Sequence, residues 1–209
     1  MRLSRHLVIF AKTPKLGAVK TRLAADIGAV AATAFYRRTL ADLMMRLGRD
    51  DRWRCWAAIS PDTAAATGVH RQAFWPVGYD VIKQGSGDLG QRMGRVFRSL
   101  PPGPTVLIGA DIPAIQAHHV KAAFRALGTH DAVFGPAGDG GYWLVGARRS
   151  PNVPDLFGGI PWSSDRTLAD TLEKLAKAGL KPALLETLED IDDGAAYRNW
   201  LTGVPSNEA

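Results

Sequence analysis

Residues 6–23 read HLVIFAKTPKLGAVKTRL, in which an apolar run passes directly into a basic loop that contains a glycine. A short apolar run of this kind is typical of a strand that is buried on both faces of a parallel sheet. The stretch therefore predicts a strand at 6–11, then a loop, then a helix. Such a strand, loop and helix form the opening unit of an α/β fold.

The remainder of the chain continues the same alternation. Further short apolar runs predict buried strands at 54–59, 105–109, 132–134 and 141–147. Apolar residues at helical spacing predict helices at 29–47, 88–100, 113–127 and 164–178. Asp88 and Gln91 have the spacing of a capping box at the start of one of these helices. We expect a three-layer α/β fold with a mostly parallel central sheet and helices on both faces.

Length and composition are those of an ordinary globular protein. With 209 residues, no linker and no internal repeat, we expect a single domain over 1–209, in which 202–209 form a loose tail. The first apolar run ends at Lys12 and is too short for a signal peptide or a membrane span, so we expect a cytoplasmic protein without a membrane partner. Cys55 is the only cysteine, which excludes an internal disulfide and favours a buried strand position.

The chain is basic, with a formal net charge of +6 and an isoelectric point of about 9.7. Such a charge is compatible with nucleic-acid binding. The arginines, however, are spread along the predicted helices and form no dense basic tract. A positive field around a site for small phosphorylated ligands explains the same charge, so we expect no nucleic-acid partner.

Ligands of open α/β sheets bind beyond the carboxyl ends of the strands, which draws attention to the basic loop after the first strand. This loop carries Lys12, Gly17, Lys20 and Arg22. It is not a P-loop, because Val19 stands where that motif requires the glycine before its lysine. A basic loop that enters a helix suits phosphate binding, and a solvated loop is the alternative.

A carboxylate follows the strand at 105–109. Asp111 lies two residues beyond this strand and two residues before Pro113. In this position it suits a hard cation such as Mg²⁺. Aspartate and proline also favour the first positions of a helix, so the residues leave open whether Asp111 binds a cation or caps the next helix.

Residues 135–146 read GPAGDGGYWLVG and gather glycines around Asp139. Glycine marks places where the backbone must take unusual conformations or where a ligand comes close. A tight turn would also explain the pattern. We favour a ligand facing Asp139, because the glycines exceed what a two-residue turn requires.

The chain gathers acids at 186–193, which read ETLEDIDD. Acidic runs are usually solvated, and this one precedes a final helix whose N-terminus favours negative charge. The apolar residues 183–185 before it are compatible with a last strand. A second cation ligand in the run is the alternative.

Taken in order, FAKTPKLGAVKTRLA, QGSGDLGQRM, IGADIP, GPAGDGGYWLVG, GIPWSSDRT and LEDIDD resemble a bacterial family of glycosyltransferase-like, radical-SAM/selenodomain-associated transferases. That family is similar to the phospholactate guanylyltransferases and the molybdenum-cofactor nucleotidyltransferases. The resemblance covers about residues 7–200 and implies the nucleotide-diphospho-sugar transferase (GT-A) fold.

The resemblance also implies site residues. A Mg²⁺ (or Mn²⁺) ion would be held by Asp111 together with Asp190 or Asp192. The nucleotide would be bound by Lys12, Gly17, Lys20, Arg22, Gln84, Asp88 and Arg92. The acceptor side would include Gly140, Gly141, Tyr142, Trp162 and Ser163. Alternatively, Arg92 belongs to a solvated helix stripe, Trp162 to the core, and Ser163 or Ser164 to a helix cap.

One departure from the family pattern concerns the acidic run. Family members tend to read DVDTPEDL where this chain has DIDDGAAY, so that Asp193 replaces threonine and Ala196 replaces the last acid. The change bears on the helix-capping role of the motif rather than on the metal, because Asp190 and Asp192 remain.

The expected activity is a Mg²⁺-dependent transfer from a nucleotide-activated donor to a small-molecule acceptor, with Asp111, Asp139 and Lys20 as catalytic residues. The leading donor is a nucleoside diphosphate sugar, and Asp139 would be the general base. The first alternative is nucleotidyl transfer from a nucleoside triphosphate to a phosphorylated acceptor with release of pyrophosphate. An alternative of another class is a non-catalytic module that binds RNA or a protein.

Overall fold

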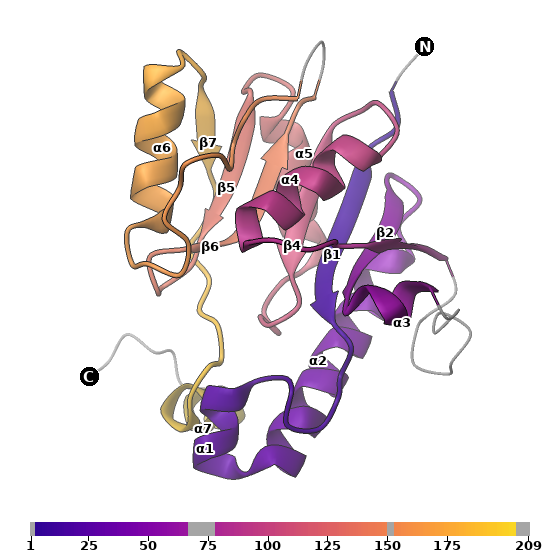
Figure 1. Cartoon of the computed structure of the whole chain (residues 1–209), viewed down its shortest axis with the longest axis vertical. Coiled ribbons are helices and arrows are strands. Elements are labelled where there is room, and N and C mark those ends of the chain that lie inside the picture. The colour runs from indigo at the N-terminus through magenta and orange to yellow at the C-terminus, as the bar shows by residue number, and fades with distance from the viewer. Residues whose placement is uncertain (1–2, 67–77, 150–152, 204–209) are drawn as a thin grey trace.

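A seven-stranded sheet in the order β3-β2-β1-β4-β6-β5-β7 organises the computed structural model, which describes residues 3–66, 78–149 and 153–203 (Figure 1). The strands are β1 (His6–Lys12), β2 (Arg54–Ser60), β3 (Tyr79–Lys83), β4 (Thr105–Gly109), β5 (Ala132–Pro136), β6 (Tyr142–Ala147) and β7 (Pro182–Leu184). β6 runs antiparallel to β4 and β5, and the other pairings are parallel. The prediction of a mostly parallel sheet is confirmed.

Helices cover both faces of this sheet, as predicted. They are α1 (Thr21–Ile27), α2 (Ala29–Gly48), α3 (Asp62–Ala66), α4 (Leu89–Ser99), α5 (Ala117–Ala126), α6 (Thr167–Lys177) and α7 (Gly194–Thr202). One core joins the sheet to α2 and α5, and the second joins the opposite face to α4 and α6. Among the helices of the described residues, none is long and apolar enough to cross a membrane.

The continuous apolar run of β1 is explained by burial on both faces. Leu7 and Ile9 lie in the core beneath α2, whereas Val8 lies in the core beneath α4. Each strand residue points to the face opposite its neighbour, so a strand between two helical layers needs apolar residues at consecutive positions. Cys55 of β2 is buried as predicted, and burial raises the pKa of its thiol to about 11.

Several predicted boundaries are wrong. The helix predicted at 113–127 begins only at Ala117, with Gln116 as its N-cap, and the helix predicted at 164–178 begins at Thr167. Thr202 ends α7 and Gly203 caps it with a φ of 70°, so these two residues are not part of a loose tail. The remaining tail residues, 204–209, lie outside the described residues.

Two elements carried no prediction, β3 and α3. β3 is an edge strand whose sequence, YDVIK, is only partly buried, so it lacks the apolar run that marks the inner strands. α3 spans only five residues.

A small helical lobe lies beyond the carboxyl end of β1. α1 and α7 pack beside the N-terminal part of α2, below the sheet in Figure 1. Phe35 of α2 makes edge contacts with Tyr197 and Trp200 of α7. The lobe places the start of α1 and the start of α7 at the edge of the sheet where ligands of this fold class bind.

The buried His6 predicts a specific pH dependence of stability. Burial lowers the pKa of His6 below 6.5, and Trp56 Nε1 donates to its Nδ1 at 3.1 Å. The unfolded chain then binds the proton more readily, so the stabilisation is present above pH 6.5 and is lost as pH falls through the folded pKa. Urea unfolding should show a loss of up to about 1.4 kcal/mol per pH unit in the wild type that His6→Gln lacks. Equal pH slopes in the two proteins would contradict the prediction.

Candidate functional site

The centre of the candidate site is a buried lysine between two aspartates. Lys20 directly precedes α1, Asp111 follows β4 by two residues, and Asp192 precedes α7. Lys20 Nζ donates to Asp192 Oδ1 at 2.6 Å and lies 3.3 Å from Asp111 Oδ2. The Lys20 side chain is only 3% exposed, whereas those of Asp111 and Asp192 are 50% and 39% exposed. The ammonium thus joins three distant segments, and both carboxylates remain open to solvent.

This cluster holds more negative charge than Lys20 neutralises. Burial and the neighbouring Asp192 raise the pKa of Asp190 to about 6. Burial alone would raise the pKa of Asp192 as well, but its bond to Lys20 holds that pKa below the ordinary value. Asp139 also acts on Asp190 through its charge, which places the glycine-rich turn near the cluster. Arg22, which is exposed, adds only a distant contact of 3.7 Å to Asp192.

The residue types, rather than their present spacing, suit a hard divalent cation, because the ligand atoms of Asp111, Asp190 and Asp192 do not all lie within 4.8 Å of one another. Asp111, Asp190 and Asp192 offer carboxylate oxygens, which Mg²⁺ and Mn²⁺ prefer, and the surplus negative charge favours a further cation. The capping alternative for Asp111 is wrong, because Gln116 is the N-cap of α5. Asp193 caps α7 instead, and its side chain accepts from the N–H of Ala196. Capping of the final helix is therefore retained despite the departure from the family pattern.

A cleft of about 360 Å³ adjoins the cluster. It brings together Lys12, Lys20, Gln84, Arg92 and Asp111, all of which the sequence predicted for the site. The rest of its lining is mostly apolar and comes from the ends of β1 and β4 and from the loop and helices beside them: Phe10, Ala11, Val19, Tyr36, Leu89, Gly109 and Ala110.

Gln84 and Arg92 form one unit at this cleft. Gln84 Nε2 donates to Ala11 O at 2.9 Å and to Ala58 O at 2.7 Å, and its Oε1 accepts from Arg92. Both amide hydrogens of Gln84 are therefore used within the protein. Arg92 is half-buried, with its guanidinium 5.4 Å from the centre of the Phe10 ring. The alternative that Arg92 belongs to a solvated stripe is wrong.

Sequence reasoning missed two side chains of α2 that fix the loops of the site. Tyr36 Oη donates to Lys12 O at 3.0 Å and accepts from Lys12 N at 2.9 Å. Arg46 donates to Pro113 O at 3.1 Å and also to Ile115 O. α2 thus holds the end of β1 and the chain after β4. Nothing in the sequence sets Arg46 apart, because it is one of three arginines in α2.

The glycine-rich turn between β5 and β6 is packed against the protein itself. Asp139 Oδ1 accepts from Gly141 N at 2.9 Å, so residues 139–141 form an Asx turn. A Cβ on Gly138 would overlap the carboxylate of Glu189, and a Cβ on Gly140 would overlap the Asp165 carbonyl. The close approach predicted for these glycines is therefore real, and in this structure the approaching groups belong to the chain.

The residues predicted for the acceptor side lie near one another. The Tyr142 and Trp162 rings are 6.4 Å apart between centroids. Trp162 is half-buried and lines a second cavity of about 410 Å³, together with Asp88 of the α4 capping box. Ser163 is exposed at a φ of 63° and does not cap α6. Ser164 Oγ instead accepts from the N–H of Arg166 at the start of that helix.

Replacing a glycine by alanine should destabilise the protein far more in the turn between β5 and β6 than in the loop before α1. Gly17 and Gly140 have φ values of 72° and 83°, but nothing lies within 4 Å of a Cβ on Gly17. Gly17→Ala should therefore cost about 1 kcal/mol for the left-handed conformation alone. Gly140→Ala should cost at least about 3 kcal/mol, because the new methyl group also meets the Asp165 backbone. Equal free energies of unfolding would show that the turn relaxes freely.

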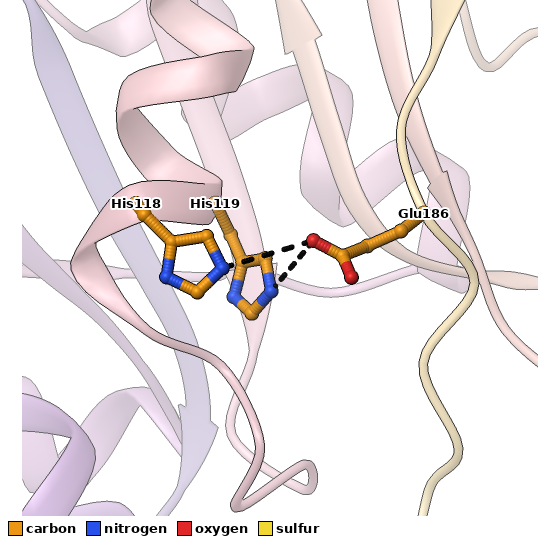
Figure 2. A group of neighbouring side chains, drawn as sticks. All are labelled: His118, His119 and Glu186. Atoms are coloured by element: carbon orange, nitrogen blue, oxygen red, sulfur yellow. Dashed lines mark ion pairs between the residues drawn. The ribbon is translucent and has the colours of Figure 1, made fainter.

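A separate polar cluster joins α5 to the segment after β7 (Figure 2). His119 Nε2 lies 2.9 Å from Glu186 Oε1, and His118 Nε2 lies 3.8 Å from the same oxygen. His119 Nδ1 accepts from the N–H of Gln116 at 2.8 Å, so in the neutral ring the proton sits on Nε2 and points to Glu186. Because this nitrogen is a donor, we interpret the cluster as a clasp rather than a metal site.

This clasp holds the segment that carries the acidic run. Trp143 Nε1 donates to Glu186 O at 3.2 Å, and Leu188 N donates to Pro136 O at 3.1 Å. Glu189 and the aspartates that follow are thereby tied to the edge of the sheet before the chain enters α7.

Comparisons with known proteins agree with this architecture. Residues 40–164 match the family described as "Uncharacterized protein conserved in bacteria (DUF2064)". No curated protein is similar enough to the chain to serve as a relative. The chain is 30% identical to a protein of Desulfovibrio desulfuricans G20 that is provisionally named a nucleotide-diphospho-sugar transferase, with a TM-score of 0.86. That match covers 98% of this chain and 90% of the other.

More distant structures share the fold alone. The inositol-1-phosphate CTP transferase of T. maritima is 12% identical, with a TM-score of 0.58 and coverage of 99% of this chain and 98% of the other. Rv0371c of Mycobacterium tuberculosis H37Rv, in complex with manganese, is 15% identical, with a TM-score of 0.53 and coverage of 97% and 100%. The predicted resemblance to the nucleotide-diphospho-sugar transferase superfamily is confirmed.

Proposed function

We propose that this chain, which belongs to the bacterial family DUF2064, is a metal-dependent transferase that takes its donor group from a nucleotide-activated compound. One observation carries the proposal: Lys20, Asp111, Asp190 and Asp192 converge at the carboxyl edge of the sheet, beside a cleft of about 360 Å³. A nucleotide diphosphate needs cationic groups and a metal to balance its charge, and this edge offers cationic side chains and carboxylates that would hold a metal.

The cleft is the place we assign to the nucleotide. Lys12, Lys20 and Arg92 supply positive charge along its lining, and Phe10, Val19 and Leu89 supply apolar surface for a base or ribose. Gln84 holds Arg92 and the strand ends in place rather than donating to the base. Asp111 lies at the border of the cleft, where the diphosphate would meet the carboxylate cluster.

The metal ion would be held by Asp111 together with Asp190 or Asp192. When bound, Mg²⁺ or Mn²⁺ would offset the charge that develops on the departing diphosphate. The manganese complex of the structurally similar Rv0371c supports a divalent ion in this fold. Lys20 and Lys12 would stabilise the same charge from the protein side.

The leading reaction is glycosyl transfer from a nucleoside diphosphate sugar. An acceptor hydroxyl would attack the anomeric carbon, the bond from that carbon to the diphosphate oxygen would break, and the nucleoside diphosphate would leave. Asp139 is the proposed base: its Oδ1 accepts a turn N–H, and its Oδ2 would take the hydroxyl proton. The second cavity, lined by Trp162 and Asp88, is the proposed acceptor space. The similarity to the Desulfovibrio protein supports this choice of donor.

Nucleotidyl transfer is the second candidate. In it, a phosphorylated acceptor would attack the α-phosphorus of a nucleoside triphosphate, and pyrophosphate would leave. The engagement of Asp139 within its own turn favours this candidate, because attack by a phosphate needs no general base.

A thermal-shift panel separates these functions. Nucleotide sugars and nucleoside triphosphates would each be tested with Mg²⁺ and with EDTA, since a ligand that binds only the folded state raises the melting temperature. Stabilisation by a nucleotide sugar in Mg²⁺ but not in EDTA supports glycosyl transfer. Stabilisation by nucleoside triphosphates and not by nucleotide sugars supports nucleotidyl transfer. Binding of RNA that weakens steeply with salt and ignores EDTA would instead support the non-catalytic module.

A further inference from the structure

The buried lysine already holds the oxygens that a metal ion would take. Lys20 Nζ donates to Asp192 Oδ1 at 2.6 Å and lies 3.3 Å from Asp111 Oδ2. These two carboxylates belong to the proposed metal ligands. A divalent ion and an ammonium group compete for such oxygens, because each is attracted by the same negative charge and repelled by the other.

The backbone conformation at Lys20 indicates that the fold specifies the position of this side chain between the two aspartates. Lys20 has a φ of 48°, a left-handed conformation that lysine rarely adopts, and its side chain is 3% exposed. Most lysines keep their ammonium group in water, so only the paired carboxylates offset the burial of this one. Lys12, the last residue of β1, is by contrast exposed and lines the same cleft.

The half-exposed carboxylates allow an exchange of cations. Asp111 and Asp192 are reached from solvent, whereas Lys20 approaches them from the protein side. Lys20 also lines the nucleotide cleft, so an ammonium released from the aspartates lies next to the proposed position of the phosphates.

We propose that Lys20 is a resident counter-ion that occupies Asp111 and Asp192 until a divalent ion displaces it, and that it then turns to the nucleotide phosphates. This inference rests on the proposed metal-dependent function. It assigns Lys20 two partners in succession, the aspartates in the metal-free site and the phosphates once the metal is bound.

The test is Mn²⁺ binding to the full chain without nucleotide, measured from the loss of the electron paramagnetic resonance signal of free Mn²⁺. Lys20→Met should bind Mn²⁺ at least about tenfold more tightly than the wild type, because the competing charge is gone. Lys20→Asn is the second variant, since asparagine tolerates the left-handed conformation and favours a folded chain. Lys15→Met is the matched control: it removes an exposed charge from the loop that carries Lys20, and its affinity should stay within about threefold of the wild type.

Circular dichroism would first establish that both Lys20 variants are folded. Mn²⁺ binding by both that is equal to or weaker than that of the wild type would then overturn the proposed exchange of Lys20 for a divalent ion. Asp111→Asn distinguishes this failure from failure of the proposed function. If Asp111→Asn abolishes Mn²⁺ binding while the Lys20 variants resemble the wild type, the metal site stands and the exchange is wrong. If the wild type and every variant fail to bind millimolar Mn²⁺, both the metal-dependent function and the exchange are wrong.

Discussion

Asp111→Asn is expected to weaken Mg²⁺-dependent nucleotide binding by about 100-fold or more, because it removes a charged ligand from the carboxylate cluster. The loss should disappear when binding is measured in EDTA, where the metal makes no contribution in either protein. The fold should persist, since the Asp111 side chain is 50% exposed and does not cap α5. Isothermal titration calorimetry with the nucleotide identified in the thermal-shift panel measures the change in affinity.

Asp193→Asn is the matched control for this variant. It removes the same charge from the neighbouring acidic run, but the Asp193 side chain caps α7, a role that asparagine performs equally well. We expect the nucleotide affinity of Asp193→Asn to stay near that of the wild type. Equal losses in the two variants would show that Asp111 acts only through the combined negative charge of the acidic residues and not as a metal ligand.

Gln84→Leu is expected to lower the free energy of unfolding by about 3 kcal/mol or more, since each buried polar group left without a partner costs about 1–3 kcal/mol. The carbonyls of Ala11 and Ala58 would lose their donor, and Arg92 would lose its acceptor. Chemical denaturation with urea measures the change. Nucleotide binding should fall as well, through the displaced Arg92.

Gln91→Leu is the control for the Gln84 variant, because Gln91 is the exposed partner of the α4 capping box. It should cost about 1 kcal/mol or less. If Gln84→Leu unfolds like the wild type and loses only nucleotide binding, then Gln84 contacts the ligand directly, as the sequence resemblance implied.

Sequence reasoning succeeded where a local pattern has a single physical cause. The uninterrupted run of β1 requires burial on both faces, and the spacing of Asp88 and Gln91 forms the capping box at the start of α4. It failed at 113–116, where proline suggested a helix start. There Arg46 of α2 holds the backbone carbonyls of Pro113 and Ile115, and this long-range contact leaves no local pattern.

The same distinction applies to the candidate site. Asp111, Lys20 and the acidic run stood out because each follows a strand or precedes a helix. That Lys20 is buried between Asp111 and Asp192 could not be predicted, because the contact depends on how the lobe of α1 and α7 docks at the sheet. Tyr36 was missed for the same reason, since its partner is the backbone of Lys12.

The bond from Lys20 to Asp192 joins residues 172 positions apart, and Asp192 follows every strand of the sheet. During synthesis, the strands up to β6 can pair before Asp192, which lies far beyond β6 in the sequence, has left the ribosome. Such a chain would hold Lys20 and Asp111 without their third partner, and contacts this distant in sequence form slowly. Ligand binding at this edge should therefore be the last property that a newly made molecule acquires, after the strands up to β6 have paired.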